Sequence, residues 1–372
     1  MGWDLLTLKI AFVCPRYWPS RGGVERYVRE IATRLTSNNE VEVLTTDPHG
    51  KLPTCERVQG VQVKRFRAWA PSDTIHFSLS MFNYLRKFSD SYDIVHANSY
   101  HGLPAYYAAE CKGSNKLVLS PHFHGTVGHT RIATLLHIPY KFLGRSIFEK
   151  ADSIVCSSRF EMEEILRAFR IPINRLVRIE EGIIPIPRVT EPQSKQEKAE
   201  KTILCVSRFE KYKGIQHIIA ALPHLPKVFN LTLIGSGPYT ARLDELVNRL
   251  SLQERVVMKH DLTEDALYRS YEEADVAVLL SQHEAYSLFV GEALSAGLPC
   301  VVANQGALEE WVDRENCVGV DNPSNPKAVA EAILRVTGRR VNRSVPNWDD
   351  YVQRLVEVYE HVLQSQDGLR SG

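Results

Sequence analysis

Short apolar runs alternate with amphipathic segments along most of the chain. In the first half, the apolar runs stand at residues 8–14, 40–46, 61–66, 92–99, 116–120 and 151–158. The segments between them place apolar residues at helical spacing, as in residues 22–37. Strands that are buried on both faces read as continuous apolar runs, so this pattern predicts parallel strands with helices on both sides of the sheet.

The pattern breaks near residue 182 and then restarts. Residues 182–201 contain prolines and then a polar, charged stretch, which is typical of a linker. Further elements are expected at residues 202–208, 229–237, 255–260, 275–281, 299–304 and, as a last helix, 348–364. We therefore predict an α/β protein of two doubly wound, Rossmann-like domains that face a central cleft. Such sheets bind ligands at the carboxyl ends of their strands, so the cleft is the predicted site.

Composition narrows the class of protein and its partners. A chain of 372 residues is long for one core, so two domains are expected. The formal net charge is +1, and no overall basic field indicates nucleic acid. The seven cysteines are scattered without a C-x-x-C pair, which is typical of a reducing compartment. We see no cleavable leader and no apolar run of the ~20 residues that span a bilayer, so we expect a cytoplasmic protein.

The stretch HEAYSLFVGEALSAGLP, residues 283–299, places Glu284 and Glu292 on either side of an apolar turn. A helix is expected to begin near Ser287 and Leu288, and its first free N–H groups would suit an anion such as a diphosphate. Eight helical residues span ~12 Å, comparable to the reach from a sugar across a diphosphate to a ribose. Carboxylates bind sugar hydroxyls well. The alternative is that Glu292 only favours the first helical turn and Glu284 is solvated.

A basic cluster follows the strand expected at residues 202–208. Arg208 and Lys213, in SRFEKYKG, stand where that strand would empty into the cleft. A guanidinium fork and an ammonium would neutralise a diphosphate and stabilise it as a leaving group. A solvated basic loop is the other interpretation.

Glycines follow several of the expected strands. In IGSGPY, Gly235 and Gly237 would allow close approach to a nucleoside, although the third glycine of a dinucleotide fingerprint is missing. Gly22 and Gly23 precede the first helix and would let a ligand reach its N-terminus, unless they form only a flexible loop. Gly182, in IEEGI, is expected at the cleft.

Two histidines, His122 and His124 in PHFHG, follow the strand at residues 116–120. Being two apart, they are expected on one strand face. A hydrogen-bonding histidine at the cleft is favoured over a metal pair, because no carboxylate or cysteine lies nearby in the sequence. The chain has no D-x-D, which argues against a metal-held diphosphate, and no P-loop, H-E-x-x-H or G-x-S-x-G motif.

Taken in order, these motifs resemble glycosyltransferase family 4, whose retaining enzymes have the GT-B fold and an E-x7-E signature. The resemblance covers nearly the whole chain, through GGVE, PHFHG, EGI, SRFEKYKG, GSGPY, ADVAVLLS and EAYSLFVGEALSAGLP. It implies a metal-independent, hexose-type transferase without a cofactor, which moves a sugar from a nucleoside-diphosphate sugar to a hydroxyl of a glycan or lipid-linked acceptor. It also implies an acceptor-side domain over 1–186, onto which a C-terminal helix within 346–372 packs back, and a nucleotide-sugar domain over 187–345.

The resemblance and the residues together give candidate sets. The catalytic set is His124, Arg208, Lys213 and Glu284; the donor-binding set is Gly22, Gly23, Gly235, Gly237, Ser287, Leu288, Phe289 and Glu292; the acceptor-side pair is Glu181 and Gly182. The resemblance implies that Arg208 and Lys213 hold the diphosphate, Glu284 the sugar hydroxyls and Glu292 the ribose. It places His124 beside the donor sugar and the acceptor.

Ser287 and Glu181 depart from the family pattern, which often has Gly and Asn at these positions. No carboxylate in the motifs is an obvious nucleophile. We therefore favour same-face attack on the sugar, in which the departing phosphate accepts the proton of the acceptor.

Two other functions stay open at this point: a nucleotide-sugar epimerase or hydrolase of similar fold, and a non-catalytic subunit that binds sugar nucleotides. The sequence does not identify the base, the sugar or the acceptor. Residues 82–88 and 138–150 mix aromatic side chains with Lys and Arg. Such helices fit either peripheral contact with the cytoplasmic face of a membrane or packing with solvated basic edges.

Overall fold

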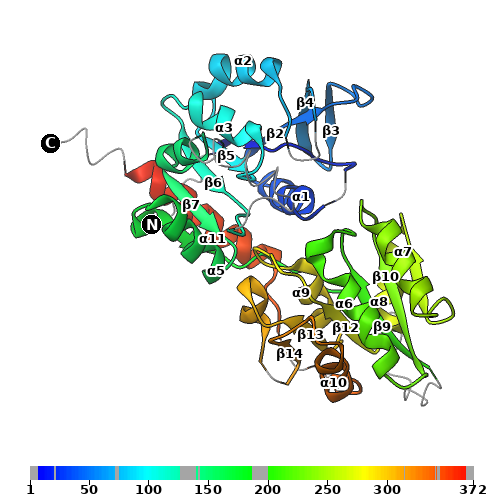
Figure 1. Cartoon of the computed structure of the whole chain (residues 1–372). Coiled ribbons are helices and arrows are strands. Elements are labelled where there is room, and N and C mark those ends of the chain that lie inside the picture. The colour runs from blue at the N-terminus through cyan, green and yellow to red at the C-terminus, as the bar shows by residue number, and fades with distance from the viewer. Residues whose placement is uncertain are drawn as a thin grey trace. The chain divides into compact units, whose positions relative to one another are not determined.

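The protein is described from a computed structural model, which describes residues 7–20, 22–71, 75–125, 140, 143–186, 200–313, 315–339, 341 and 344–365. The chain forms two compact units (Figure 1). One contains Met1–Gly182 and Asn347–Gly372, and the other contains Ile183–Pro346. The structure thus has α/β architecture in both halves, as the alternation of apolar runs predicts.

The first unit is built on an eight-stranded sheet. Its strands, in chain order, are β1 (Lys9–Val13), β2 (Glu40–Asp47), β3 (Cys55–Val58), β4 (Val61–Arg67), β5 (Ile94–Asn98), β6 (Lys116–Ser120), β7 (Ser153–Cys156) and β8 (Leu176–Arg178). Their spatial order is β3-β4-β2-β1-β5-β6-β7-β8. All neighbouring strands are parallel except β3 and β4, which are antiparallel. The short edge strands β3 and β8 were not expected from the sequence.

Helices cover both faces of this sheet. They are α1 (Gly23–Leu35), α2 (Leu79–Phe88), α3 (Leu103–Glu110), α5 (Arg159–Phe169) and α11 (Trp348–Gln364), with residues 143–150 also helical. One core contains side chains of α2, α3 and α5 with Ala11 and Val13 of β1. The alternate residues of β1, Ile10 and Phe12, are equally buried, which explains the continuous apolar run that the strand presents in the sequence.

Helix α11 comes from the end of the chain and packs on this first unit. The hydroxyl of its Tyr359 lies 2.6 Å from Nδ1 of His96 on β5, and the hydroxyls of Tyr351 and Tyr27 are hydrogen-bonded. His96 Nε2 is 2.8 Å from the Oγ atom of Ser120. Buried hydrogen bonds thus fix this helix to strands and helices far from it in sequence.

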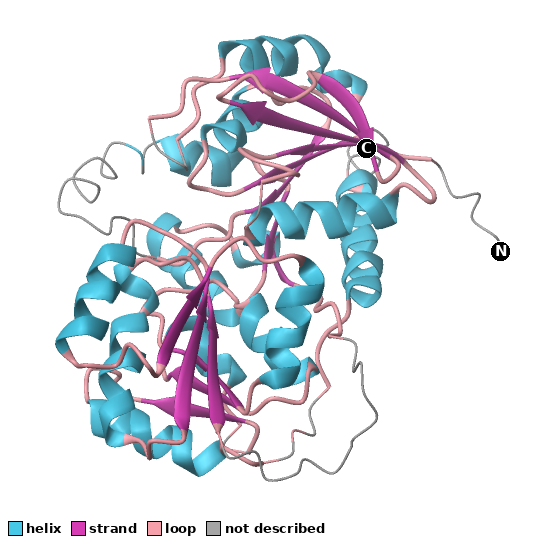
Figure 2. Ribbon diagram, turned by 90° about the vertical axis from the view of Figure 1, so that its right-hand side faces the viewer, coloured by secondary structure: helices cyan, strands magenta, loops and turns pink. Residues whose placement is uncertain are grey.

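The second unit is built on a six-stranded, wholly parallel sheet. Its strands are β9 (Lys201–Val206), β10 (Phe229–Ile234), β11 (Val256–Lys259), β12 (Val276–Leu279), β13 (Cys300–Ala303) and β14 (Cys317–Val320), in the order β11-β10-β9-β12-β13-β14. Its helices are α6 (Ile215–Ala221), α7 (Thr240–Arg249), α8 (Glu264–Glu273), α9 (Leu288–Ser295) and α10 (Pro326–Val336). Figure 2 shows helices on both sides of the strands of this sheet. Side chains of α6, α7 and α10 share one core, and those of α8 and α9 share another.

Each sheet has a point at which the strand order reverses. In the first unit, β1 has β2 on one side and β5 on the other, and in the second unit β9 lies between β10 and β12. Open α/β sheets bind ligands beyond the carboxyl ends of the strands at such points. The loops that leave β1, β5, β9 and β12 are therefore where each unit would hold a ligand.

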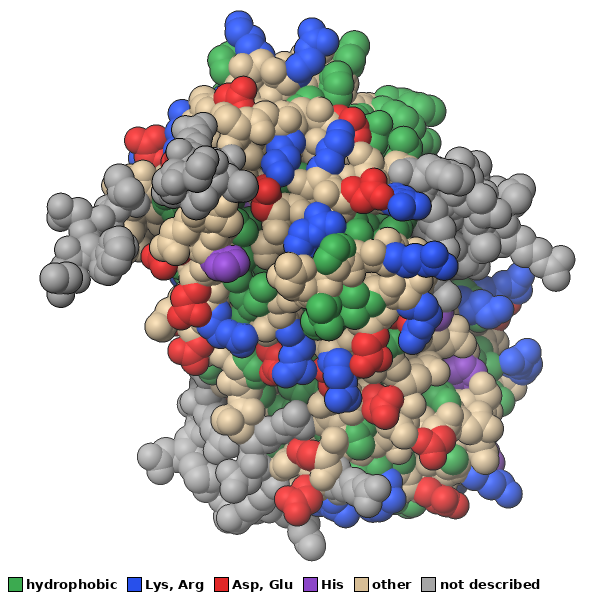
Figure 3. Space-filling model, turned by 90° about the vertical axis from the view of Figure 1, so that its left-hand side faces the viewer, with side chains coloured by type: hydrophobic (Ala, Val, Ile, Leu, Met, Phe, Trp, Pro, Cys, Tyr) green, Lys and Arg blue, Asp and Glu red, His purple; other side chains and the backbone are tan. Residues whose placement is uncertain are grey.

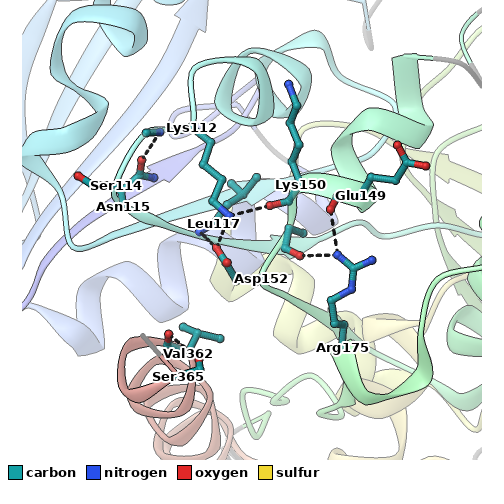
Figure 4. Close-up of polar contacts among 12 residues, drawn as sticks. Lys112, Ser114, Asn115, Leu117, Glu149, Lys150, Asp152, Arg175, Val362 and Ser365 are labelled. Atoms are coloured by element: carbon teal, nitrogen blue, oxygen red, sulfur yellow. Dashed lines mark hydrogen bonds and ion pairs between the residues drawn. The ribbon is translucent and has the colours of Figure 1, made fainter. Parts of the chain in front are cut away.

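Polar contacts also form at the opposite edge of the first sheet, near the amino-terminal ends of β6, β7 and β8 (Figure 4). Asp152 Oδ2 accepts the N–H of Leu117 at 2.7 Å and pairs with Lys112 Nζ at 2.7 Å. The Arg175 guanidinium donates to the carbonyls of Glu149 and Ala151. These contacts connect the segments that precede β6, β7 and β8.

Charged side chains of both signs are mixed on the face of the molecule drawn in Figure 3, where Lys and Arg are interspersed with Asp and Glu. In α2, Phe82 and Tyr84 pack against the core while Arg86, Lys87 and Phe88 are exposed. Membrane contact of residues 82–88 stays a prediction. Parts of the segment 138–150 lie outside the described residues. No helix in the described ranges is long and apolar enough to cross a bilayer.

Candidate active site

The second unit brings two candidate residues into contact at its switch point. Lys213 lies in the loop that follows β9, and Glu284 lies in the loop that follows the neighbouring strand β12. Lys213 Nζ is 2.6 Å from Glu284 Oε1. The two side chains are only 15% and 14% exposed, so this is a largely buried cation–carboxylate pair.

The pair is electrostatically coupled. Burial lowers the pKa of the Lys213 ammonium, but the charge of Glu284 and the neighbouring Tyr212 outweigh this effect, and the pKa is raised overall. Lys213 is therefore a fixed positive charge at neutral pH. A fixed cation at the carboxyl edge of a parallel sheet suits an anionic ligand group.

Arg208 lies in the loop that follows the same strand, β9, but its side chain is more exposed than that of Lys213. Its guanidinium lies 3.3 Å from Glu210 Oε1, and its side chain is 47% exposed. Sequence reasoning did not include Glu210. The structure therefore places Lys213 and Glu284 together, with Arg208 in the same loop but in a different ion pair.

Helix α9 begins at Leu288, as the sequence indicates, and Ser287 is its N-cap residue. The Ser287 hydroxyl accepts the N–H of Val290 at 3.4 Å. The N–H groups of Leu288 and Phe289 fall in the first turn, where no intrahelical acceptor exists. Glu284 precedes this helix and Glu292 lies within it, so the residues between them are only partly helical and the ~12 Å span of eight helical residues does not apply to their separation.

Glu292 is buried inside the unit. It is 5% exposed, and its Oε2 accepts the hydroxyl of Tyr271 on α8 at 2.5 Å. This partner was missed, because nothing in the sequence links a tyrosine on one helix to a glutamate on the next. The hydrogen bond from Tyr271 fixes the orientation of the Glu292 carboxylate. A ribose held by Glu292 would have to bind this carboxylate.

The glycines after β10 have a packing role. A Cβ atom on Gly235 would lie 1.9 Å from the carbonyl oxygen of Ser207, and one on Gly237 would lie 2.4 Å from that of Phe209. Gly235 also has a φ of 142°, which favours glycine. These glycines therefore let the loop after β10 lie against the loop after β9, the loop that carries Lys213.

The first unit holds the remaining candidates, and the histidines are not arranged as predicted. Strand β6 ends at Ser120, so residues 121–125 form a loop and His122 has a left-handed φ of 49°. The two histidines consequently do not share a strand face. His122 packs edge-on against Tyr27, while His124 stacks on His101 with ring centroids 5.0 Å apart.

Glu181 and Gly182 are both committed to internal contacts. Glu181 is 5% exposed, its Oε1 accepts the Ser157 hydroxyl at 2.8 Å, and the same oxygen lies 3.4 Å from His122 Nδ1. A Cβ atom on Gly182 would lie 2.5 Å from the backbone of Trp348, so a glycine is needed where α11 begins.

Gly22 and Gly23 lie at the start of α1. A Cβ on Gly22 would meet the Glu25 carboxylate, whereas a Cβ on Gly23 would meet nothing within 4 Å. Glu25 in turn pairs with Arg16, which follows β1, at 2.7 Å. The open space at Gly23 is consistent with ligand access, and the sequence analysis had missed the Arg16–Glu25 pair at this helix start.

The first unit and the second unit each match a known family. The family Glycosyltransferase Family 4 matches residues 21–185, and the family Glycosyl transferases group 1 matches residues 188–344. The chain belongs to glycosyltransferase family 4. This glycosyltransferase therefore has the enzyme class and the GT-B fold that the motifs imply.

Relatives and solved structures resemble this glycosyltransferase over almost its whole length. An uncharacterized glycosyltransferase of Methanocaldococcus jannaschii is 28% identical, with 96% of this chain and 99% of that protein covered. A D-inositol 3-phosphate glycosyltransferase of Xylanimonas cellulosilytica is 27% identical, with 91% of both covered. Sucrose-phosphate synthase from Thermosynechococcus elongatus has a TM-score of 0.74 at 20% identity, covering 96% of this chain and 99% of that one.

A further structure, of Anabaena HepE in complex with UDP and glucose, has a TM-score of 0.74 at 16% identity and covers 95% of this chain and 99% of that one. At these identities the structural likeness establishes the fold of the glycosyltransferase alone.

Ser287 has a strained backbone conformation, which should lower the stability of the glycosyltransferase. Its φ of 122° and ψ of 90° fall where residues other than glycine are disfavoured. We expect Ser287→Gly to stabilise the protein by about 1 kcal/mol, because relief of strain outweighs loss of the cap. Ser287→Ala keeps the strain and loses the cap, so it should destabilise by about 1 kcal/mol. Urea unfolding of both variants checks this, and equal destabilisation by the two would show that Ser287 is unstrained.

Proposed function

We propose that this family 4 glycosyltransferase transfers a hexose-type sugar from a nucleoside-diphosphate sugar to a hydroxyl of a glycan or lipid-linked acceptor, with retention of configuration. The observation that carries the proposal is the buried Lys213–Glu284 pair at the switch point of the second sheet. It supplies a cation for a diphosphate and a carboxylate for sugar hydroxyls within one contact, at the edge where such sheets bind ligands.

The neighbouring groups extend this donor site. Arg208 stands in the same loop as Lys213, and the first-turn N–H groups of Leu288 and Phe289 add donors for a phosphate or a sugar oxygen. Glu292, oriented by Tyr271, would accept the ribose hydroxyls. Across this set, charge and hydrogen-bond donors match a diphosphate that bears a sugar at one end and a ribose at the other.

In the proposed reaction, the acceptor oxygen attacks the anomeric carbon on the face that the diphosphate leaves. The bond from that carbon to the phosphate oxygen breaks, the bond to the acceptor oxygen forms, and the acceptor's proton passes to the departing phosphate. Lys213 and Arg208 stabilise the negative charge that develops on the leaving group. As the family resemblance implies, His124 would lie on the acceptor side of the sugar. Because Lys213 and Arg208 supply positive charge and the chain lacks a D-x-D pair, we expect the rate to be unchanged by EDTA.

Several relatives and neighbours support a nucleotide-sugar donor and an acceptor of the glycan or lipid class. HepE structures hold UDP and UDP-glucose. Relatives include an alpha-monoglucosyldiacylglycerol synthase of Streptococcus pneumoniae and a GDP-mannose:cellobiosyl-diphosphopolyprenol alpha-mannosyltransferase of Xanthomonas oryzae. Cytoplasmic location with peripheral membrane contact stays a prediction, which vesicle sedimentation in low and high salt would test.

A donor screen tests the function. UDP, GDP and ADP sugars are added in a thermal-shift assay, and we expect one of them at 100 times its Kd to stabilise the protein by about 2.7 kcal/mol. Product analysis then follows with and without lipid and oligosaccharide acceptors. A glycoside that forms only with an acceptor, with the anomeric configuration of the donor, supports the proposal. An altered sugar nucleotide without acceptor would indicate an epimerase or hydrolase, and binding without turnover a non-catalytic subunit.

A further inference from the structure

The loop at residues 121–125, which carries His124, is held by a carboxylate that belongs to no sequence motif. Glu161 is the third residue of α5 and is fully buried. Its Oε1 accepts the N–H of Phe123 at 2.6 Å, and its Oε2 accepts the N–H of Ser157 at 2.7 Å. One carboxylate thus joins the loop after β6 to the start of α5.

A second buried carboxylate converges on the same residues. Glu181 accepts the hydroxyl of Ser157 at 2.8 Å and lies 3.4 Å from Nδ1 of His122. Ser157 therefore gives its N–H to Glu161 and its hydroxyl to Glu181. Each of the two carboxylates therefore connects Ser157 with the loop at residues 121–125.

The loop needs such a restraint. His122 adopts a left-handed φ of 49°, an uncommon conformation for a residue other than glycine. Phe123, next to it, is fully buried among Tyr100, Phe148 and Phe169. The N–H of a residue buried this deeply must find an acceptor, and Glu161 provides it.

We propose that Glu161 is a positioning residue, whose carboxylate holds the 121–125 loop in the conformation in which His124 takes part in the reaction. This inference rests on the proposed function, in which His124 lies on the acceptor side of the transferred sugar. Glu161 acts through the backbone of Phe123 and has no contact with substrate. Its effect should therefore appear in kcat, because misplacing a catalytic group slows the chemical step while the donor diphosphate is held by the other unit.

The ionisation of Glu161 gives this role a pH signature. Burial raises the pKa of Glu161 to about 7, although the His122 charge and the two N–H donors oppose the rise and Glu181 adds to it. Burial lowers the pKa of His122, but its contact with Glu181 and the charges of Glu181, Glu161 and Glu25 raise it overall. Tyr27 and Cys156 also interact electrostatically with Glu161, and burial raises the pKa of each above its ordinary value.

Protonation of Glu161 turns one of its two acceptor oxygens into a hydroxyl, so one of the two N–H contacts is weakened. The ionised Glu161 carboxylate, which accepts both N–H groups, predominates above pH ~7, and its population falls as the pH falls through that value. We therefore expect kcat of the wild-type enzyme to decline below pH ~7. In Glu161→Gln, which keeps one acceptor oxygen and does not titrate, that decline should be absent.

The test compares Glu161→Gln with Glu163→Gln, an exposed neighbour on the same helix. For Glu161→Gln we expect kcat to fall by about tenfold or more with the donor KM within about twofold, and amide exchange at Phe123 to accelerate by about tenfold or more. Glu163→Gln should match the wild type in all three measurements. Thermal unfolding of each variant verifies that the protein remains folded.

Two results would overturn the proposal: wild-type kcat in Glu161→Gln despite faster exchange at Phe123, or loss of kcat with unchanged exchange there. An acid limb that persists unchanged in Glu161→Gln would also overturn the assigned pH dependence. Failure of the proposed function would look different, since the wild-type enzyme itself would then form no glycoside.

Discussion

Replacing Lys213 with methionine is expected to lower kcat on the order of 10²-fold or more. The ammonium is fixed 2.6 Å from Glu284 at the carboxyl edge of β9 and β12, where it would stabilise the charge that develops on the departing diphosphate. The same change leaves the Glu284 carboxylate largely buried without its partner, so we also expect a loss of about 3 kcal/mol in the free energy of unfolding. Initial rates and urea unfolding measure the two effects separately.

A second variant separates catalysis from stability. In Lys213→Met with Glu284→Gln, no buried charge remains unpaired, so most of the lost stability should return. Activity should not return, because the cation is still missing. Recovery of turnover in the double variant would show that Lys213 serves only to neutralise Glu284, and would remove the main support for a diphosphate site at this position.

Much of the fold could be predicted because all strands of both sheets except the edge strand β3 are parallel to their neighbours, and helices cover both faces of each sheet. Such strands appear in the sequence as unbroken apolar runs, and the residues that follow them must meet at one edge. Lys213 and Glu284 are 71 positions apart, yet each stands just after a buried strand, and those two strands are neighbours. The order of the parallel strands therefore suffices to predict that Lys213 and Glu284 lie at the same edge of the sheet.

The rest of the site depends on contacts that no local pattern encodes. The antiparallel edge strand β3 has alternating exposure and no continuous apolar run. Tyr271 and Glu292 lie on different helices, and the Glu161 carboxylate meets the Phe123 N–H across 38 positions. At Gly235 and Gly237 the structure adds a close backbone contact that a Cβ atom would block, while ligand approach at these glycines stays a prediction. Each of these contacts depends on which residues are buried against one another, and a single sequence does not reveal burial residue by residue.

Tyr359→Ala is expected to destabilise the first unit by about 3–5 kcal/mol, the usual loss for removing a fully buried aromatic ring. Tyr359 is fully buried on α11, and its hydroxyl is hydrogen-bonded to Nδ1 of His96 in the central part of the sheet. Burial holds the pKa of His96 near 3, with the His122 charge adding to the effect, so the ring is neutral and relies on Tyr359 and Ser120 for its two hydrogen bonds. Equilibrium unfolding followed by intrinsic fluorescence measures the change.

Two further variants separate the contribution of the Tyr359 ring to stability from that of its hydroxyl and test the specificity of the effect. Tyr359→Phe keeps the ring and removes only the hydroxyl, so it should cost about 1–3 kcal/mol, the penalty for leaving a buried His96 nitrogen without a partner. Glu360→Ala, at the exposed neighbouring position, should change stability by no more than about 0.5 kcal/mol. If Tyr359→Ala were as harmless as Glu360→Ala, α11 would not be part of the cooperative core of the first unit. The buried hydrogen bonds from Tyr359 through His96 to Ser120 end next to the loop that carries His124, so the same experiment asks whether helix α11 supports that loop.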